Sequence, residues 1–391
     1  MKKIKKLQLT LKSIIKYPKI VYDINSIKSN IIFFFPHYNT GGAEEVHLDI
    51  IKSVSEQNVT CFITEQSKDS DLKSQFEKNS KLIELYRWGW KISLKKAMLK
   101  TIARKINAIP NAVIFGCNSR FFYDLIPFLS KDIRVIDLIH TFLGEYNYSM
   151  DNYSLKHVPN IHSRVVLGEN QKKKQIIFYA ENKIHQDLNK RIHIIHNKIS
   201  TSNTIYKKDF DDQLTILFVA RNSEEKRAQL FIDITKTCLE LKLPFEFTMI
   251  GDFDEYFDKI GSNVTMTGKI TDKLLLQFYY EKAHMVMITS KFEGFPMVLL
   301  EGMARGSVPI STNVGEIPTY LSEDKQTGFL IDNSQDELKI RTDFVKKLIF
   351  INTNREILKK YSLNVQELVK IEFNEETFTE KYQAIFRNSL N

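Results

Sequence analysis

The stretch that decides the fold reads Lys291-Phe-Glu-Gly-Phe-Pro-Met-Val-Leu-Leu-Glu-Gly-Met-Ala-Arg-Gly-Ser-Val-Pro-Ile310. An apolar run at 284–290 precedes it and predicts a strand, after which Glu293-Gly294 makes the turn into a helix. Pro296 suits the first helical position, because its ring fixes φ and its missing N–H would be unpaired there. Glu293 then lies just before the helix N-terminus, where free backbone N–H groups gather, and Glu301 lies about one and a half turns inside. Two carboxylates and free amides in this arrangement could hold a phosphate or a sugar hydroxyl.

This stretch resembles the Glu-x7-Glu signature of the retaining nucleotide-sugar glycosyltransferases of family 4, which have the GT-B fold. The resemblance includes the intervening Gly-Phe-Pro, the Met-Ala-x-Gly that follows, the Val-Pro-Ile strand and the turn Val314-Gly-Glu-Ile-Pro318. Taken alone, two glutamates at this spacing would favour an ordinary junction with two surface carboxylates, so the flanking residues carry the resemblance. It covers residues 30–390 in architecture, and its specific motifs are concentrated in 214–332.

Composition limits the classes of protein that the chain can be. Its 391 residues exceed one typical core, so two domains of about 150–200 residues are expected. The sequence contains no apolar run of the ~20 residues that a membrane helix needs and no secretory signal. The cysteines are far apart and lack metal-ligand spacing, so we expect buried apolar residues in a reducing cytoplasm. They are Cys61, Cys117 and Cys238.

The net charge of +9 suggests nucleic-acid binding, but its distribution argues against it. Residues 1–30 hold eight lysines against one aspartate, which leaves only +2 for the rest of the chain. On a helix, the apolar residues from Ile4 to Ile15 share one face, so we predict a basic amphipathic helix over 1–29. Through residues 1–20 it could bind an anionic bilayer, which would place the protein on the inner face of the cytoplasmic membrane. Equally, its apolar face could pack on the protein itself.

Strand and helix signals alternate from residue 30 onward, which predicts an α/β fold of two doubly wound parallel sheets. The helical pattern at 93–106 is one of the clearest between strands. The predicted strands are Asn30–Phe35, Val59–Thr64, Leu82–Tyr86, Ala112–Cys117, Arg134–His140, Arg164–Leu167, His193–Ile195, Leu214–Ala220, Phe245–Ile250, Val264–Met266, His284–Ser290, Val308–Ser311 and Phe329–Ile331.

These elements divide into two Rossmann-like domains. The first is expected over 30–200 and the second over 213–370, joined by a polar linker at 201–212. The resemblance implies that the first binds the acceptor, the second binds the nucleotide-sugar donor, and the two face each other across a cleft. It also implies that the last helix, within 371–391, crosses back to the first domain.

The second domain contains a cationic turn, Arg221-Asn-Ser-Glu-Glu-Lys226, after its first strand. It resembles the family's Gly-Arg-x4-Lys motif, with Ala220 in place of glycine and Arg227 where a glycine often follows. The resemblance implies that Arg221 and Lys226 bind the donor diphosphate, whose charge grows as it departs. A solvated charged turn is the alternative.

The resemblance also assigns roles around the two glutamates. Glu301 is expected to bind the ribose hydroxyls, since a carboxylate accepts two such bonds. Glu293 is expected to act at the donor sugar as a catalytic residue. The backbone of Gly294, Phe295 and Pro296 is expected to contact the donor sugar and phosphate.

Three positions in the first domain are further candidates. Gly41-Gly42 joins the first strand to the first helix, and paired glycines let a backbone approach a ligand closely. The resemblance implies that His140, at a strand end, acts beside the donor sugar, although Thr141 follows where an acidic residue is frequent. Asn118, at another strand end, is a weaker candidate for a sugar contact. Each could instead be a structural turn or a surface residue.

Two other motifs are discounted. Asp252-Phe-Asp254 resembles a metal-binding Asp-x-Asp, but it follows a predicted strand and we interpret it as a turn. No metal cofactor is expected, because Arg221 and Lys226 would supply the positive charge. Trp88-Gly-Trp90 could lie at a membrane interface or stack on an acceptor sugar, and buried packing fits equally well.

The function implied is transfer of a sugar, with retention, from a nucleotide-diphosphate sugar to a hydroxyl of a glycan or lipid-linked glycan. In the family, the acceptor attacks on the face from which the diphosphate leaves. The basic N-terminus suggests bacterial surface polysaccharide synthesis, such as lipopolysaccharide or capsule. Alternatives are a GT-B sugar-nucleotide epimerase or phosphorylase, and a non-catalytic membrane-associated scaffold.

Overall fold

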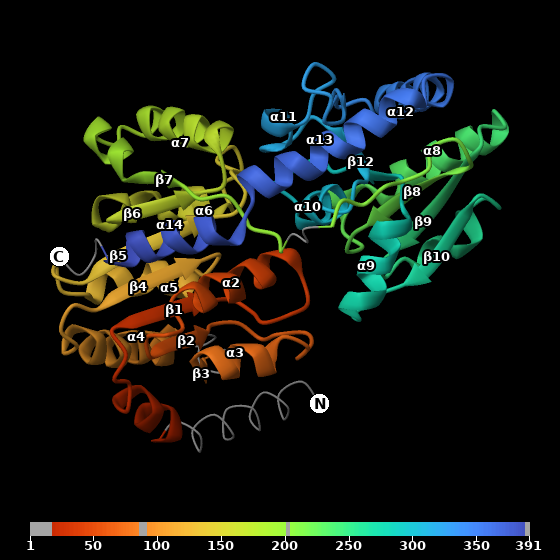
Figure 1. Ribbon diagram of the computed structural model, residues 1–391. Coiled ribbons are helices and arrows are strands. Elements are labelled where there is room, and N and C mark those ends of the chain that lie inside the picture. Colours follow the sequence, from red (N-terminus) through yellow and green to blue (C-terminus); the bar gives the residue numbers. More distant parts are fainter. Residues whose placement is uncertain (1–17, 86–91, 201–203, 388–391) are drawn as a thin grey trace. The chain divides into compact units, whose positions relative to one another are not determined.

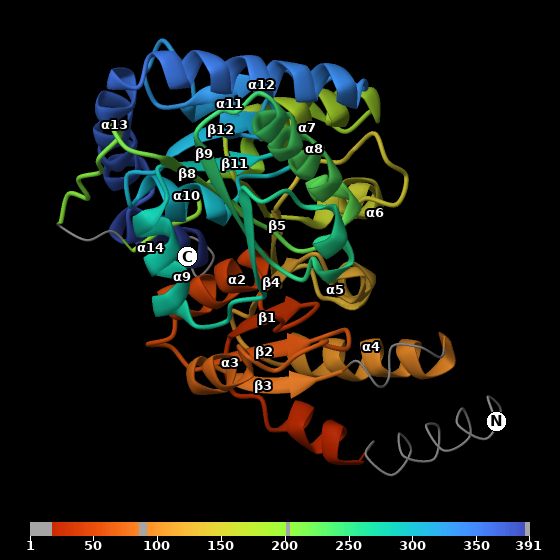
Figure 2. The same cartoon turned by 90° about the vertical axis from the view of Figure 1, so that its right-hand side faces the viewer.

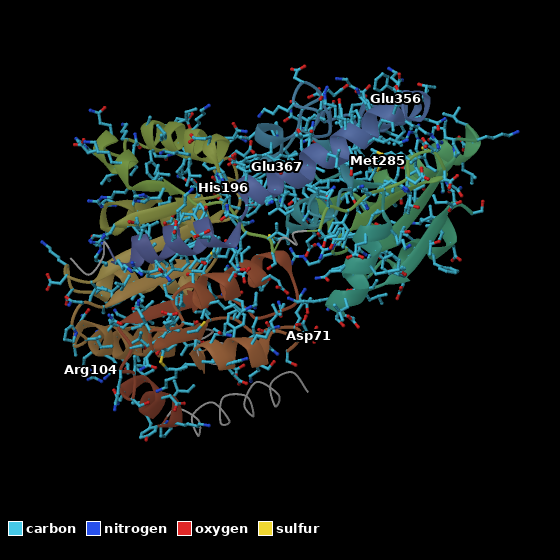
Figure 3. All side chains as sticks on the ribbon, in the orientation of Figure 1. Asp71, Arg104, His196, Met285, Glu356 and Glu367 are labelled. Carbon is cyan, nitrogen blue, oxygen red and sulfur yellow. The ribbon has the colours of Figure 1, made fainter. Side chains whose placement is uncertain are left out.

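The computed structural model describes residues 18–85, 92–200 and 204–387, and the chain divides into two compact units (Figure 1). The first unit runs to Val166 and also contains Lys172–Ile195 and the chain from Phe378. The second contains Leu167–Gln171 and His196–Thr377, and Figure 3 labels His196 where its longer segment begins.

The first unit is built on a seven-stranded parallel sheet in the order β3-β2-β1-β4-β5-β6-β7. Every residue of β1 is buried, with β2 on one side of it and β4 on the other. This explains the continuous apolar runs in the sequence, since strands covered on both faces need no polar side. The strands are β1 (Ile31–Phe35), β2 (Val59–Ile63), β3 (Lys81–Glu84), β4 (Val113–Cys117), β5 (Arg134–Ile139), β6 (Ser163–Val166) and β7 (Ile192–Ile194).

Helices connect these strands and cover the sheet. Figure 2 shows α4 beside β2 and β3, and its Met98 and Ile102 share a core with Ile32 and Phe62. The α-helices are α2 (Gly42–Ser53), α3 (Lys73–Asn79), α4 (Ile92–Asn107), α5 (Arg120–Leu125), α6 (Met150–Ser154) and α7 (Glu169–Glu181). The 3-10 helices are η1 (Ile126–Phe128), η2 (Leu155–Asn160) and η3 (Gln186–Arg191).

The second unit is built on a six-stranded parallel sheet in the order β10-β9-β8-β11-β12-β13. In both sheets the strand order reverses beside the first strand of the unit, at β1/β4 and at β8/β11. Ligands of doubly wound sheets bind at such switch points, outside the carboxyl ends of the strands. The strands are β8 (Leu214–Val219), β9 (Phe245–Ile250), β10 (Val264–Gly268), β11 (Met285–Ile288), β12 (Val308–Thr312) and β13 (Phe329–Ile331).

The helices of the second unit complete the chain. They are α8 (Ala228–Glu240), α9 (Lys273–Lys282), α10 (Met297–Met303), α11 (Ile317–Tyr320), α12 (Glu337–Thr353), α13 (Glu356–Glu372) and α14 (Glu375–Arg387), with the 3-10 helices η4 (Glu224–Lys226) and η5 (Asp254–Lys259). The last of them, α14, packs mainly in the first unit, where Tyr382 and Phe386 contact the ring of Phe115.

Three features differ from the sequence prediction or lie outside the described chain. Residues 204–212, part of the predicted linker, belong to the second unit, because Phe210 is buried in its core. The predicted N-terminal helix lies outside the described residues up to position 17, whereas 18–25 is helical and Ile24 is buried in the first unit. The Trp88-Gly-Trp90 motif also lies outside them. No helix in the described part of the chain is long and apolar enough to cross a membrane.

Candidate functional site

The candidate residues of the first unit follow three neighbouring strands. Gly41-Gly42 follows β1, Asn118 follows β4 and His140 follows β5, and these strands are adjacent in the order β1-β4-β5. The carboxyl ends of parallel strands lie at one edge of the sheet, so the structure brings these positions to the same edge.

Backbone conformation explains two of these positions. A Cβ atom on Gly41 would lie 2.7 Å from Oε2 of Glu44, so the glycine leaves room for this buried carboxylate at the start of α2. Asn118 has φ of 51°, in the left-handed region that costs most residues about 1–2 kcal/mol. Strained residues at a strand end often mark functional sites.

His140 is paired with a second histidine that sequence reasoning missed. Its Nε2 lies 3.1 Å from Nε2 of His47, a buried residue of α2 whose ring stacks on Phe35 at 4.1 Å. Burial lowers the pKa of His140 to about 4 and, together with the nearby His140 and His37, lowers the pKa of His47 well below its usual value. Both imidazoles are therefore neutral at pH 7, and the N–H of one ring donates a hydrogen bond to the unprotonated nitrogen of the other. The only sequence signal for His47 is a histidine among the apolar residues of a predicted helix.

Cys117 joins this pair to make the one metal-ligating group in the described part of the chain. The ligand atoms of His47, Cys117 and His140 lie within 4.8 Å of one another, and zinc accepts such a ligand set. Burial and the nearby Asp137 and Glu44 raise the pKa of the Cys117 thiol, so the sulfur is protonated. The hydrogen bond between the histidines accounts for their approach without an ion.

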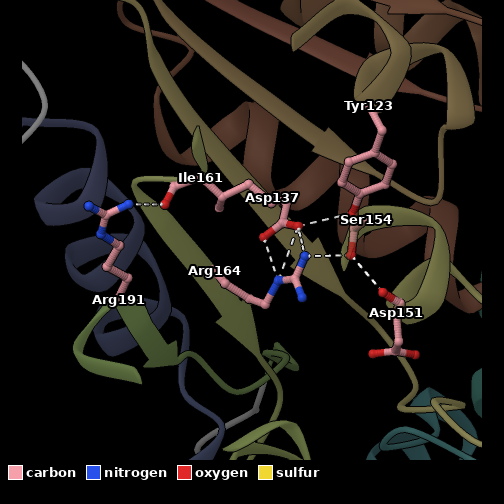
Figure 4. A network of polar contacts seen from close by, with 7 residues as sticks. All are labelled: Tyr123, Asp137, Asp151, Ser154, Ile161, Arg164 and Arg191. Atoms are coloured by element: carbon pink, nitrogen blue, oxygen red, sulfur yellow. Dashed lines mark hydrogen bonds and ion pairs between the residues drawn. The ribbon is translucent and has the colours of Figure 1, made fainter. Parts of the chain in front are cut away.

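A buried polar network lies below the end of β5 (Figure 4). Asp137, three residues before His140, accepts hydrogen bonds from the guanidinium of Arg164 at 2.6 to 3.2 Å and from the hydroxyl of Tyr123 at 3.0 Å. Arg164 also donates to Ser154 at 2.7 Å. Both charged side chains are at most 1% exposed. The network ties β5 to β6 beneath the strand end that carries His140.

In the second unit, the turns after β8 and β11 come together around an ion pair. Nζ of Lys226 lies 2.5 Å from Oε1 of Glu293, and Ser290 donates a hydrogen bond to the same oxygen at 2.6 Å. The two side chains are 20% and 11% exposed. Thr289 fixes the turn further, because its hydroxyl donates to the backbone carbonyl of Lys226 at 2.7 Å.

Arg221, the second predicted cation, lies just beyond the end of β8 and is exposed. Among the described residues its side chain makes no hydrogen bond or ion pair. The Asp252-Phe-Asp254 motif lies between β9 and η5, where both aspartates are exposed on either side of buried Phe253. This is the turn that the sequence predicted.

The backbone of the Glu293-to-Pro296 loop is held by the turn after β12. A Cβ on Gly315, whose φ is +60°, would lie 2.3 Å from the carbonyl oxygen of Glu293. The next N–H, of Glu316, donates to the carbonyl of Gly294 at 2.9 Å. Only a residue without a side chain permits this close approach and this φ, so Gly315 sets the position of the loop.

The loop is also supported from below by Phe295. Its ring stacks on Phe373 with centroids 4.9 Å apart, and its carbonyl accepts a hydrogen bond from Asn197 at 3.2 Å. Pro296 is the cap residue before α10, with ψ of 132°, and not the first helical residue as predicted. The extended ψ fits the usual preference of the residue that precedes a helix.

Glu301 lies in α10 and meets another residue that sequence reasoning missed. Oε2 of Glu301 accepts a hydrogen bond of 2.6 Å from the hydroxyl of Tyr280, a buried residue of α9. Glu316 is a third missed residue. Its buried carboxylate accepts from the backbone N–H groups of Asn170, at 3.2 Å, and Gln171, at the start of α7.

Two Rossmann-like parallel sheets define the class of this protein as the GT-B fold, and comparison with solved structures bears this out. HepE from Anabaena, in complex with UDP-glucose, matches with a TM-score of 0.69 at 14% identity, over 92% of this chain and 99% of that one. TarM matches with a TM-score of 0.71 at 13% identity, over 93% and 99%. A glycosyltransferase from Rickettsia africae matches with a TM-score of 0.69 at 16% identity, over 93% and 100%. The predicted fold class is therefore confirmed.

The match to a family model falls within the second unit. Residues 213–345, about a third of the chain, match the family model described as Glycosyl transferases group 1. The chain is 26% identical over 200 residues to an uncharacterized glycosyltransferase of Methanocaldococcus jannaschii, covering 49% of this chain and 52% of that protein. It is 28% identical over 156 residues to an uncharacterized protein in the cps region of Klebsiella pneumoniae, covering 39% and 42%. The chain thus spans about half the length of the curated relatives it matches. Together these findings support a GT-B glycosyltransferase.

Proposed function

We propose that this protein is a retaining glycosyltransferase that moves a sugar from a nucleotide-diphosphate sugar to a hydroxyl of a glycan or lipid-linked glycan. The observation that carries the proposal is the Lys226–Glu293 pair at the switch point of the second sheet. It lies inside the segment that matches the glycosyltransferase family model. An ordinary strand-to-helix turn has no need of a largely buried lysine and carboxylate in contact.

In the proposed mechanism, Lys226 binds the donor diphosphate while Glu293 keeps its ammonium group in place. Arg221, which is exposed at the end of β8, adds a second cation when the donor binds. As the bond to the sugar breaks, negative charge grows on the departing diphosphate, and fixed cations stabilise it more than they stabilise the intact donor. This is chemistry that the chain's own side chains can perform.

The donor sugar is held by Glu293 and by the backbone of the 293–296 loop, with Gly41-Gly42 and Asn118 as further contacts. His140 is neutral at pH 7, so it can hydrogen-bond a sugar hydroxyl but cannot serve as a cationic acid. The acceptor hydroxyl attacks on the face from which the diphosphate leaves and gives its proton to that phosphate. Retention of configuration follows from this same-face geometry.

Two observations narrow the substrates to be tested first. HepE has been solved with UDP-glucose, and GtfA of pneumococcus, which is also similar in fold, has been solved with UDP and GlcNAc. We therefore propose a UDP-sugar as the donor. The relative in a cps region supports a role in surface polysaccharide synthesis, with the basic N-terminus as an attachment to the anionic inner membrane face.

The test is nucleotide release from UDP-, GDP-, ADP- and CMP-sugars, with products analysed by mass spectrometry. The variants are Lys226→Met and Glu293→Gln, which remove one charge each. Lys236→Met is the matched control, because Lys236 is exposed on α8 of the same unit. Slow release of UDP and free sugar, lost in both variants and kept in the control, is the expected result.

Other outcomes would select the alternatives. An isomerised sugar still attached to its nucleotide would indicate the epimerase. Nucleotide binding by calorimetry with no release, even with glycan acceptors present, would indicate the scaffold. Release that is unchanged in both variants would refute the assigned site.

A further inference from the structure

Tyr280 contacts the candidate site residue Glu301 through its buried hydroxyl group. It is 1% exposed, and its hydroxyl donates to Oε2 of Glu301 at 2.6 Å. It is the one buried residue of α9, whose apolar residues Leu274 and Phe278 are 76% and 50% exposed. The helix is therefore anchored by the residue that meets Glu301.

The backbone of Tyr280 is fixed as firmly as its side chain. Its carbonyl accepts hydrogen bonds from the hydroxyl of Ser307 at 3.0 Å and from Nζ of Lys208 at 3.1 Å. Ser307 also donates to the carbonyl of Ala283, at 2.8 Å, beyond the end of the helix. Tyr280 is thus fixed at its backbone carbonyl and at its hydroxyl. The Glu301 carboxylate would therefore lose this hydrogen bond if it turned to another rotamer.

The proton of this hydrogen bond stays on Tyr280. Burial and the neighbouring Glu301 carboxylate raise the pKa of the Tyr280 phenol well above its usual value. Tyr280 is therefore always the donor and Glu301 always the acceptor. A carboxylate has two oxygens with about four acceptor positions, so it can accept the Tyr280 bond together with bonds from other donors.

We propose that Tyr280 is a positioning residue that holds the Glu301 carboxylate in the orientation that reads ribose hydroxyls. The pair would thereby select ribonucleoside over deoxyribonucleoside diphosphates. The inference rests on the proposed function, in which Glu301 binds the ribose of the donor.

A positioning role and a purely structural role make different predictions. If the hydroxyl only stabilises the packing of α9 against α10, its removal weakens all nucleotides equally. If it orients Glu301, its removal weakens only ligands that carry the ribose hydroxyl bound there. The ratio of ribo- to deoxyribonucleotide affinity therefore separates the two roles, whatever the loss in stability.

The experiment measures binding of UDP, 2′-deoxy-UDP and 3′-deoxy-UDP to the full chain by isothermal titration calorimetry. Tyr280→Phe removes the hydroxyl, and Tyr279→Phe is the matched control with the same change one residue earlier. Wild type should bind UDP at least tenfold more tightly than one of the deoxy forms. In Tyr280→Phe, UDP binding should weaken about tenfold, the magnitude of one lost hydrogen bond to a charged group, while that deoxy form changes less than about twofold. Tyr279→Phe should leave both affinities unchanged.

Two further results decide the remaining cases. Glu301→Asp leaves Tyr280 in place and withdraws the carboxylate by one methylene, so the same ratio should collapse even if Tyr280→Phe does not fold. Normal wild-type discrimination with an unchanged ratio in Tyr280→Phe, or equal weakening of all three ligands, would overturn the inference alone. Failure of wild type to bind UDP, GDP, ADP or CDP would overturn the proposed function and this inference with it.

Discussion

Removing Arg164 should unfold the first unit more readily, because it leaves a carboxylate buried without its cation. Asp137 is completely buried and Arg164 is 1% exposed, and they share three hydrogen bonds. In Arg164→Met only the hydroxyl of Tyr123 would still donate to Asp137. Breaking a buried pair in this way costs about 3–5 kcal/mol. For a unit of this size, that corresponds to a Tm lower by roughly 10 °C.

A double variant tests the same charge argument. Replacing both partners, in Asp137→Asn with Arg164→Met, should recover much of the loss, because no unpaired charge remains.

The assay is thermal unfolding by calorimetry at pH 7. The matched control is Arg191→Met, because the Arg191 guanidinium donates to the backbone carbonyls of Pro159, at 3.2 Å, and Ile161, at 2.8 Å, the second of which is drawn in Figure 4. It should cost about 1 kcal/mol. A loss below about 1 kcal/mol in Arg164→Met, or a double variant no more stable than the single one, would refute this account of the network.

Three further predictions concern the candidate site. Gly315→Ala should abolish turnover and lower the Tm, because its Cβ would lie 2.3 Å from a carbonyl oxygen. The control Gly268→Ala, with φ of +73° and nothing within 4 Å of the new Cβ, should cost only about 1–2 kcal/mol of stability and keep activity. Equal effects would refute the steric argument. Arg227→Gly should change stability by less than about 1 kcal/mol in urea unfolding, because relief of φ of 50° offsets the lost hydrogen bond to Asn333 and the lost ion pair with the exposed Glu337. A loss above about 2 kcal/mol would show that the side chain dominates. Because the pKa of His140 is lowered to about 4, the unfolded state binds more protons below pH 6.5, so stability should fall by up to roughly 3 kcal/mol between pH 6.5 and 4, and less in His140→Asn. An equal loss of stability between pH 6.5 and 4 in wild type and in His140→Asn would contradict this.

The central strands could be predicted from the sequence because many of them, such as β1, β2 and β4, are buried at every position. Runs such as 31–35 and 214–219 are apolar at nearly every position, and the turns that separate them contain glycine or charged residues. Lys226 and Glu293 could be brought together for the same reason, since both follow strands that proved adjacent. Local sequence therefore predicts which residues stand at the carboxyl edge of each sheet.

The partners of those residues could not be predicted. His47 is 93 positions from His140, and Tyr280 is 21 positions from Glu301 on a different helix. Which hydroxyl or imidazole reaches a site residue depends on how helices pack over the sheet, and periodicity carries no information on that. The assignment of 204–212 failed for a related reason. The segment is polar except for a few residues, and the burial of Phe210 in the core of the second unit could not be predicted from its sequence.

Ala220 and Arg227, the two departures of the cationic turn from the pattern it resembles, are both accommodated by the structure. Ala220 stands in place of a glycine, but the crowding there falls on the neighbouring strand end, where a Cβ on Gly251 would lie 2.1 Å from the carbonyl oxygen of Ala220. Arg227 has the left-handed φ that explains why glycine is frequent at this position, and its side chain compensates through Asn333 at 2.6 Å and Glu337 at 3.3 Å. Glycine is thus needed where another backbone atom approaches closely, and it can be replaced where the new side chain finds partners of its own. The turn therefore holds Lys226 against Glu293 without those two glycines.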